Sequence, residues 1–341
     1  MSVWEHEEFR GHERVTFFRD EATGLVTINA MHRLINGRCG GGIRFYSYAS
    51  SDAALTDVLR LSRAMTYKSV LAGIAFGGGK SVIIGDPAVD KTKPLLHAMG
   101  RFIDSFQGEY VAGPDVGTTA EDMATIFETT PYVAGHRDGN TSLPTAYGVF
   151  RGLQAAVKFK LGRDDLSGLT VAVQGVGGVG AQLCRHLHEA EARLIVADVD
   201  EVAVAHIVAE TGATAVAPDE ILFVECDALA PCALGGILHE GTIGKLKTAV
   251  ICGGANNQLA EPRHGDLLKE CDILFAPDYV VNSGGLIHGV TEVGMLTPEQ
   301  YEAKLDGIFE TALHIFTLAD EQDLSPEQAA EAVAEEKLAT M

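Results

Sequence analysis

Residues 169–180 read LTVAVQGVGGVG, an apolar run that passes directly into spaced glycines. The run is apolar enough to form a central strand of a parallel sheet. Gly175, Gly177 and Gly180 follow it in G-x-G-x-x-G order and open a predicted helix. In that context the first glycine allows a tight turn, the second lets backbone approach a pyrophosphate, and the third lets helix pack on strand. The segment therefore predicts a Rossmann fold that binds a dinucleotide.

The next predicted strand, residues 194–197, ends at Asp198. An acid at this point would accept hydrogen bonds from ribose hydroxyls and repel a 2′-phosphate, and no Arg or Lys stands beside it. The plainer alternative is a tight turn followed by a helix cap. The combination of strand, glycine spacing, helix and acid favours dinucleotide binding, and it favours NAD over NADP.

Length and composition exclude several classes of function. A chain of 341 residues suits two domains, each with its own core. The net charge is −21 and the basic residues are scattered, so we expect no nucleic acid partner. We find neither a leader nor an apolar run of about 20 residues, so we expect a cytoplasmic protein with no membrane contact. The 6 cysteines form no CxxC pair, and we expect no metal.

The N-terminal part predicts a sheet followed by a helix. Residues 14–20 and 24–33 predict a hairpin, and another strand is predicted near 42–46. Ser51 and Asp52 are predicted to cap the following helix, which carries Lys68 near its end.

A second lysine follows a run of glycines. Residues 77–79 are all glycine and predict a flexible loop, which would place Lys80 at the mouth of a buried strand over 81–84. The run also invites interpretation as a phosphate-binding loop. That motif needs glycine six positions before the lysine, where this chain has Ile74, and it must continue into a helix rather than a strand. A nucleotide triphosphatase is therefore the weaker alternative. Residues 131–144 are polar and rich in turns, and predict a domain boundary.

Several collinear blocks resemble the Glu/Leu/Phe/Val amino acid dehydrogenase family. The first four are GGIR (41–44), RAMTYK (63–68), GGGK (77–80) and GPDVGT (113–118). The others are TAYGV (145–149), APCALGG (230–236), GANNQL (254–259) and APDYVVNSGG (276–285).

This resemblance implies an α/β protein with two domains. Residues 1–140 would form an N-terminal substrate-binding and oligomerisation domain, and 141–300 a doubly wound, Rossmann NAD-binding domain. Residues 301–341 would form C-terminal helices that pack back toward the first domain. The resemblance also implies a homo-oligomer.

The chemistry implied by the resemblance is reversible oxidative deamination of an L-amino acid to its 2-oxo acid and ammonia, with NAD as cofactor. Lys80 matches the family's catalytic base, which activates water, and Asp115 matches the carboxylate that exchanges protons with the amine. Lys68 matches the lysine that binds the substrate carboxylate. Its positive charge would help to lower the pKa of Lys80.

The remaining site residues also follow from the resemblance. Glycines in the pocket wall would leave volume for a large apolar side chain, which implies a phenylalanine-like substrate, with leucine or another branched-chain amino acid as the alternative. The implied substrate-binding residues, besides Lys68, are Gly40, Gly41, Gly113, Asn257, Leu286 and Gly289. The implied cofactor-binding residues are Gly175, Gly177, Gly178, Val179, Gly180, Asp198, Thr145, Ala230, Pro231, Cys232, Ala255 and Asn256.

Two functions of other classes stay open as remote alternatives. An NAD-dependent 2-hydroxy acid oxidoreductase would need a catalytic His with an acid partner and an Arg for the carboxylate, and we see no such set outside the lysine blocks. A non-catalytic NAD-binding regulator would not need Lys68, Lys80 and Asp115 together.

Overall fold

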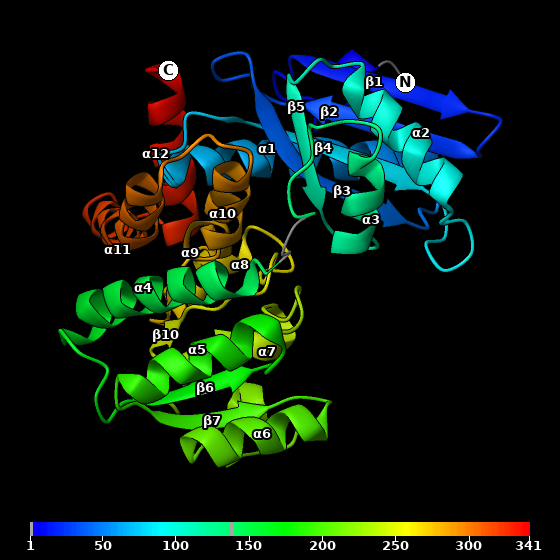
Figure 1. The fold of residues 1–341 in the computed structure, drawn as a ribbon. Helices are drawn as coiled ribbons and strands as arrows, with labels where there is room; N and C mark the ends of the chain where they lie inside the picture. Colours follow the sequence, from blue (N-terminus) through cyan, green and yellow to red (C-terminus); the bar gives the residue numbers. More distant parts are fainter. Residues whose placement is uncertain (1–2, 137–139) are drawn as a thin grey trace. The chain divides into compact units, whose positions relative to one another are not determined.

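The computed structural model describes residues 3–136 and 140–341, which divide into two compact units (Figure 1). Unit 1 comprises Met1–Asn140, Gly289–Thr297 and Leu338–Met341, and unit 2 comprises Thr141–His288 and Pro298–Lys337. The first division falls within the turn-rich stretch 131–144. Residues 137–139 of that stretch lie outside the described residues.

Unit 1 is built on a mixed five-stranded sheet in the order β1-β2-β4-β3-β5. Its strands are β1 (Arg14–Asp20), β2 (Leu25–Met31), β3 (Cys39–Tyr46), β4 (Gly77–Ile84) and β5 (Tyr110–Pro114). The antiparallel pairing of β1 with β2 confirms the predicted hairpin. β3 pairs in parallel with both β4 and β5, so segments distant in sequence meet at one place in the sheet.

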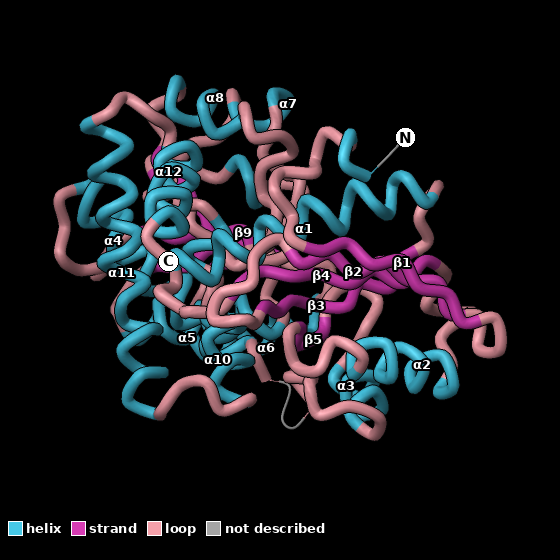
Figure 2. The backbone as a smooth tube through the Cα atoms, turned by 90° about the horizontal axis from the view of Figure 1, so that it is seen from above, coloured by secondary structure: helices cyan, strands magenta, loops and turns pink. Residues whose placement is uncertain are grey.

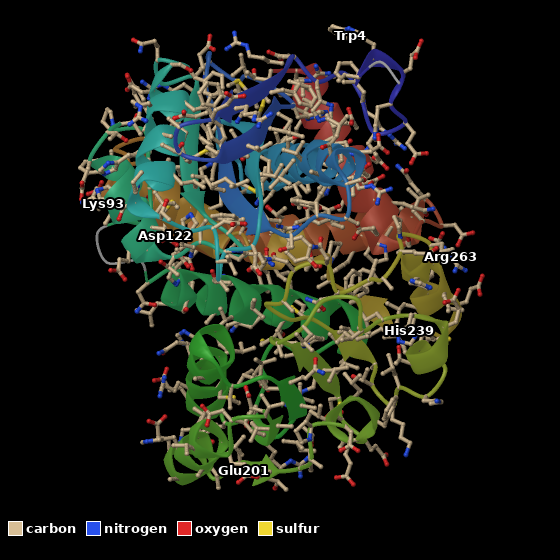
Figure 3. The ribbon with its side chains drawn as sticks, turned by 90° about the vertical axis from the view of Figure 1, so that its right-hand side faces the viewer. Trp4, Lys93, Asp122, Glu201, His239 and Arg263 are labelled. Carbon is tan, nitrogen blue, oxygen red and sulfur yellow. The ribbon has the colours of Figure 1, made fainter. Side chains whose placement is uncertain are left out.

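Helices cover both faces of this sheet (Figure 2). They are α1 (Ser51–Leu71), α2 (Lys93–Asp104) and α3 (Ala120–Phe127), and a short 3₁₀ segment, η1 (Val3–Glu5), precedes the sheet. On one face Val58 and Leu59 of α1 pack with Val82 of β4. On the other face α2 and α3 close a second apolar core. Figure 3 marks Lys93 and Asp122 on α2 and α3, where Asp122 completes the capping box of α3.

Two predictions in this unit are wrong in detail. The N-cap of α1 is Ser50 rather than Ser51 or Asp52, because Ser50 has extended backbone and its side chain accepts a hydrogen bond from the Ala53 amide. Residues 77–79 are not a flexible loop but the first residues of β4.

Close packing explains why glycines form this strand. A Cβ at Gly78 would lie 2.0 Å from the backbone nitrogen of Thr66 in α1, and one at Gly77 would lie 1.8 Å from the Arg33 carbonyl oxygen. Glycine is required here because neighbouring backbone comes so near, and the result is a rigid, buried strand. The same geometry excludes a phosphate-binding loop, since the lysine is followed by strand.

Unit 2 is built on a parallel six-stranded sheet in the order β11-β10-β9-β6-β7-β8. Its strands are β6 (Thr170–Gln174), β7 (Arg193–Ala197), β8 (Thr214–Ala215), β9 (Ala228–Pro231), β10 (Val250–Ile251) and β11 (Leu274–Phe275). The strand order reverses between β6 and β9, which confirms the predicted doubly wound Rossmann sheet. Ligands of such sheets bind outside the carboxyl ends of the strands at this reversal.

Unit 2 is otherwise helical. Its helices are α4 (Ser142–Leu161), α5 (Gly178–Glu189), α6 (Glu201–Thr211), η2 (Ile221–Phe223), α7 (Glu240–Ile243), α8 (His264–Glu270), α9 (Asp278–Val281), α10 (Gly284–Glu292), α11 (Pro298–Glu321) and α12 (Pro326–Ala339). α11 packs against α4, where a Cβ at Gly148 would lie 2.8 Å from Ile308. The last turn of α10 and the end of α12 are grouped with unit 1. Across the described ranges, every helix is too short or too polar to cross a bilayer.

Candidate active site

Lys80 lies in the middle of unit 1, on the face of the sheet covered by α1. Side chains alternate along a strand, and the Val82 side chain packs with α1 while Ser81 points to the other face, where it accepts a hydrogen bond from Asn29. Lys80 is therefore directed toward α1, and only 5% of its surface is exposed. A lysine so buried needs a charged partner.

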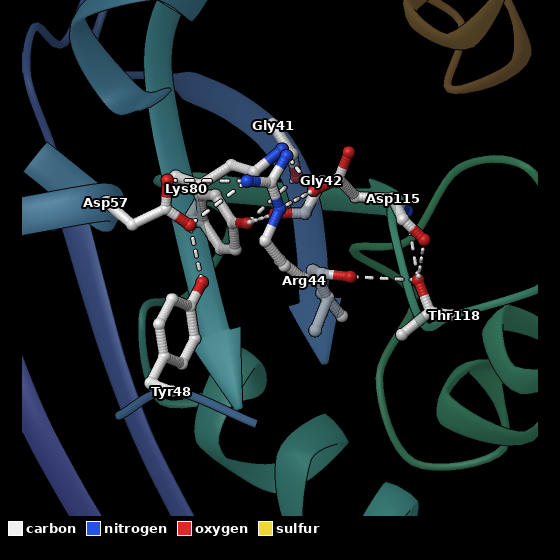
Figure 4. A network of polar contacts seen from close by, with 10 residues as sticks. Gly41, Gly42, Arg44, Tyr48, Asp57, Lys80, Asp115 and Thr118 are labelled. Carbon is white, nitrogen blue, oxygen red and sulfur yellow. Dashed lines mark hydrogen bonds and ion pairs between the residues drawn. The ribbon is translucent and has the colours of Figure 1, made fainter. Parts of the chain in front are cut away.

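Asp115, in the loop after β5, supplies that partner. Its Oδ2 lies 3.0 Å from the Lys80 Nζ and accepts a hydrogen bond of 2.8 Å from the Nε of Arg44 (Figure 4). The loop itself is held in place, since the Thr118 hydroxyl accepts from the Asp115 amide and donates to the Ile43 carbonyl. The structure thus brings together Lys80 and Asp115, the two predicted catalytic residues.

A second carboxylate holds the other side of Arg44. The Nη1 of Arg44 donates to both oxygens of Asp57 in α1, at 3.0 and 3.3 Å, and the Tyr48 hydroxyl donates to the same carboxylate at 2.5 Å. These three side chains also line a cavity of about 600 Å³, whose wall includes Arg60 and Val116.

Burial and charge set the proton affinities of the pair. Burial lowers the pKa of Lys80, and nearby Arg44 lowers it further, against the opposing effect of Asp115. Burial alone would raise the pKa of Asp115, but the charges of Lys80 and Arg44 outweigh it, so this pKa lies below its usual value. The site therefore favours an ionised Asp115 beside a lysine that gives up its proton unusually readily.

A glycine makes room for this pair. A Cβ at Gly42 would lie 2.6 Å from the Cβ of Asp115 and 3.1 Å from the Lys80 Nζ. Its neighbour Gly41, a predicted substrate-binding residue, approaches β4 so closely that a Cβ would lie 1.8 Å from the Gly79 carbonyl oxygen. These glycines let the strands and the charged groups meet.

Lys68 lies in the last turn of α1 and is half-buried. α1 packs along β4, the strand that carries Lys80, so both lysines belong to the same helix-strand pair. The role of Lys68 in binding a substrate carboxylate stays a prediction.

The predicted pocket wall contains glycines of two kinds. A Cβ at Gly113 would meet nothing within 4 Å, and one at Gly289 would meet only Ala134, at 3.8 Å. A Cβ at Gly40 would instead lie 2.4 Å from the Phe76 ring, so glycine at position 40 serves packing and leaves no open volume. Leu286, in α10 of unit 2, is half-buried.

In unit 2 the fingerprint glycines form the turn that a dinucleotide requires. Gly175 has a φ of +90°, and a Cβ at Gly180 would lie 1.9 Å from the Gly175 carbonyl oxygen, so helix α5 packs directly on β6. Gly177, the N-cap of α5, faces open space within 4 Å of its Cβ position. A tight turn with open space at the N-terminus of a twelve-residue helix fits a pyrophosphate. Gly178 and Val179 form the first turn of that helix.

Asp198 follows β7, as predicted, and turns toward the glycine turn. Its Oδ2 accepts a hydrogen bond of 2.7 Å from the Val176 amide, and its Oδ1 accepts one from Asp200. This carboxylate therefore also shapes the loop that would hold the cofactor.

The other predicted cofactor residues lie in helix α4 or at and beyond the ends of neighbouring strands. Asn256 accepts a hydrogen bond from Asn282, and the predicted substrate-binding residue Asn257 has a φ of 54°, in the left-handed region that asparagine adopts more readily than most residues. The Thr145 hydroxyl donates to the Thr141 carbonyl within α4. Ala230, Pro231 and Cys232 lie at the end of β9, and Ala255 lies in the loop after β10.

Sequence reasoning missed Arg44, Asp57 and Tyr48. Arg44 stands in the GGIR block, so its presence there was a signal that a functional arginine follows the glycines. Nothing local in the sequence indicates that Asp57 and Tyr48 hold it.

Comparison with known proteins identifies the family. Residues 12–132 match the dimerisation domain of Glu/Leu/Phe/Val dehydrogenase, and residues 197–341 match Glutamate/Leucine/Phenylalanine/Valine dehydrogenase. The chain is 46% identical to leucine dehydrogenase of Geobacillus stearothermophilus over 346 aligned positions, covering 100% of this chain and 94% of that protein. The chain belongs to the Glu/Leu/Phe/Val dehydrogenase family.

Other members of this dehydrogenase family are similar over the whole chain. Phenylalanine dehydrogenase of Caldalkalibacillus thermarum is 41% identical, with 99% of this chain and 94% of that protein covered. The crystal structure of L-tryptophan dehydrogenase from Nostoc punctiforme superposes with a TM-score of 0.86 at 41% identity, covering 97% of this chain and 96% of that one. Membership confirms the predictions of an amino acid dehydrogenase that oxidises CH–NH₂ donors and of NAD as its cofactor.

Proposed function

We propose that this enzyme oxidatively deaminates a bulky apolar L-amino acid, and that Lys80 and Asp115 carry the proton transfers. The observation that supports this most directly is the buried Lys80–Asp115 pair, 3.0 Å apart and held by Arg44. A lysine whose pKa is lowered by burial acts as a base more readily than an ordinary lysine, and a carboxylate in contact with it can pass protons to and from an amine.

The glycine turn after β6 and the carboxylate of Asp198 support a site for NAD in unit 2. We assign the pyrophosphate to Gly177, Gly178 and the N-terminus of α5, and the ribose to Asp198. Asn256 and Thr145 are assigned near the nicotinamide. When bound, NAD supplies the acceptor for the hydride that leaves the α-carbon.

The remaining steps belong to side chains of unit 1. Lys68 binds the substrate carboxylate. Once the α-carbon has been oxidised, the neutral amine of Lys80 accepts a proton from water as the water oxygen adds to that carbon. Asp115 then takes the proton of the hydroxyl group formed on the α-carbon and passes it to the nitrogen, so that the C–N bond breaks, the carbonyl of the 2-oxo acid forms and ammonia leaves. Because Arg44 remains beside it, Asp115 stays ionised between turnovers.

The proposed side-chain preference rests on the space beside two glycines. Open volume beside Gly113 and Gly289 favours an aromatic side chain, and phenylalanine is the substrate we propose first. Leucine is the second candidate, because the leucine dehydrogenase relative has the higher identity, 46% against 41%. None of the four wall positions carries a cation for a distal carboxylate, so glutamate should be a poor substrate.

The wider setting is part of the same proposal. We place the enzyme in the cytoplasm, as a homo-oligomer that assembles through unit 1, which contains the matched dimerisation domain. The molar mass measured by light scattering should exceed that of the 36.2 kDa chain, and a monomer at micromolar concentration would contradict this assembly.

Turnover of substituted enzymes tests the catalytic assignment. Lys80→Ala should lower kcat by roughly 10² to 10⁴ while NADH still binds, because a general base is lost and the cofactor site is untouched. Lys68→Ala should mainly raise the substrate KM. Lys93→Ala removes an exposed lysine of the same unit and serves as the control. Near-normal kcat in Lys80→Ala would end the assignment of Lys80.

A panel of L-amino acids with NAD, followed as NADH formation, tests the substrate. Phenylalanine should give the highest kcat/KM. Gly113→Ala should lower the kcat/KM for phenylalanine more than that for leucine, because the added methyl group enters the open volume. Highest activity on leucine, unchanged by Gly113→Ala, would replace the first candidate with the second.

A further inference from the structure

The catalytic pair has a third charged member. Arg44 is 17% exposed and contacts two carboxylates at once, Asp115 through Nε at 2.8 Å and Asp57 through Nη1 at 3.0 Å. A guanidinium group is planar and presents its donors in fixed directions, so contact at two edges fixes its orientation. Tyr48 adds a hydrogen bond to Asp57, which anchors the outer end of this chain of contacts.

The charges around Lys80 balance only while Lys80 is protonated. Two cations, Lys80 and Arg44, then face two carboxylates, Asp115 and Asp57, and each carboxylate has a cationic partner. When Lys80 releases its proton, Asp115 loses one of its two cationic partners and keeps the other. A buried carboxylate without a cation would recapture the proton, because an unpaired buried charge is costly.

We infer that Arg44 is a positioning residue of this dehydrogenase: it holds Asp115 ionised and directed at Lys80 while Lys80 is neutral, with Asp57 and Tyr48 fixing Arg44 in place. The inference rests on the proposed roles of Lys80 and Asp115. It assigns Arg44 no contact with substrate or cofactor.

The charges around Lys80 and Asp115 shift the pKa of each residue in a definite direction. Arg44 lowers the pKa of Lys80 and that of Asp115, while Asp115 and Asp57 raise the pKa of Lys80. Two tyrosines also sense the charge of Asp115: Tyr110 of β5, whose hydroxyl donates to the Gly41 carbonyl, and Tyr48, whose hydroxyl donates to Asp57. Loss of Arg44 should therefore raise the pKa of Lys80, so that the active, neutral form of Lys80 appears only at higher pH.

The cavity beside Arg44 permits a direct test. Arg44 and Asp57 line a cavity of about 600 Å³, and the Arg44 side chain connects it to Asp115, so we expect a guanidinium ion to enter the space that Arg44→Ala leaves between the two carboxylates. We expect Arg44→Ala to lower kcat about tenfold or more near neutral pH and to move the midpoint of the pH–kcat profile upward by about one unit. Millimolar guanidinium should restore part of kcat and lower that midpoint, and sodium chloride at the same ionic strength should do neither.

Two further variants keep the outcome decisive. Arg44→Lys keeps a charge but cannot contact both carboxylates, so it should fold, keep a near-normal pH midpoint and lose kcat several-fold. Arg60→Ala removes an arginine that lines the same cavity and pairs with Glu8, and it should leave kcat and the pH profile unchanged.

The contrary results are equally distinct. A folded Arg44→Lys with normal kcat would overturn the inference, as would an Arg44→Ala enzyme that changes only the substrate KM, which would mean direct carboxylate binding. An impaired Arg44→Ala with an unchanged midpoint and no response to guanidinium would leave Arg44 a purely structural role and also overturn it. Active Lys80→Ala would instead show that the proposed function fails.

Discussion

Glycine runs occur in both units, and they serve different physical ends. In unit 1, Gly78 is part of a buried strand and has no room for a side chain, because the backbone of α1 lies 2.0 Å from its Cβ position. In unit 2, Gly177 lies at a turn and faces open space. The first glycine permits contact within the protein, and the second leaves space for a ligand.

The difference shows that a glycine cluster alone does not indicate flexibility. The run 77–79 positions Lys80, the proposed base, because it lets helix α1 and strand β4 pack closely. The fingerprint combines both uses, since Gly180 packs helix on strand while Gly177 stays open. Substitution by alanine separates these two uses, because it adds only a Cβ. At a packed glycine this Cβ collides with neighbouring atoms, and at an open glycine it does not.

The largest effect is expected at Gly78. Gly78→Ala forces a methyl group against the backbone nitrogen of Thr66, so the helix must shift, and we expect the free energy of unfolding to fall by about 3 kcal/mol. Urea unfolding followed by circular dichroism measures this. Gly113→Ala is the matched control in the same sheet. Its methyl group meets nothing within 4 Å, so its stability should change by less than about 0.5 kcal/mol. Equal losses in the two variants would contradict the packing account.

The same region shows what the sequence could predict. The hairpin, the helix of Lys68 and the strand after Lys80 follow from local periodicity, and all three were predicted. Residues 77–79 were mispredicted because local preference for glycine favours a loop, whereas the deciding contact comes from Thr66 in another element. The close packing of α1 on β4 therefore outweighs the local preference of glycine for loops.

In the candidate active site, too, some residues could be predicted from the sequence and others could not. Lys80 and Asp115 could be predicted because they stand in recognisable blocks, and the structure places them in contact. The bond from Arg44 to Asp115 joins residues 71 positions apart, and Asp57 and Tyr48 complete it from α1 and the loop after β3. No local pattern encodes such a chain of contacts, since its members share no motif.

An intermediate loss of stability is expected on acidification, because a buried histidine contacts Thr66, the residue that packs against Gly78. The Thr66 hydroxyl accepts a hydrogen bond from the Gly78 amide, and it lies 2.9 Å from the Nδ1 of His32. Burial lowers the pKa of His32 to about 3, and that of the neighbouring His12 to about 4. Both rings are therefore neutral in the folded protein at neutral pH.

The direction of the stability change with pH follows from proton uptake by the unfolded chain. Unfolded histidine has a pKa of 6.5, so below that pH the unfolded chain binds protons that folded His32 does not, and stability falls as the pH drops toward the folded pKa. We expect His32 alone to contribute a loss of about 2 kcal/mol between pH 6.5 and pH 5, measured by urea unfolding. His32→Gln should flatten this slope, while His206→Gln, at an exposed position in unit 2, should not. Identical slopes in wild type and His32→Gln would contradict the account.

The smallest effect, and the one that separates the two kinds of glycine most cleanly, is expected at Gly177. Gly177→Ala adds a methyl group to open space at a helix N-cap, where glycine is preferred to alanine, so stability should fall by about 1 kcal/mol, well below the loss expected for Gly78→Ala. If this space admits the pyrophosphate, the methyl group should weaken NADH binding about tenfold, which corresponds to about 1.4 kcal/mol. Fluorescence titration with NADH measures the affinity. Gly307→Ala, whose Cβ position in α11 is equally open, should leave the affinity unchanged. Unaltered NADH affinity in Gly177→Ala would mean that the open space lies away from the cofactor, and the contrast between the two glycine runs would then reduce to packing alone.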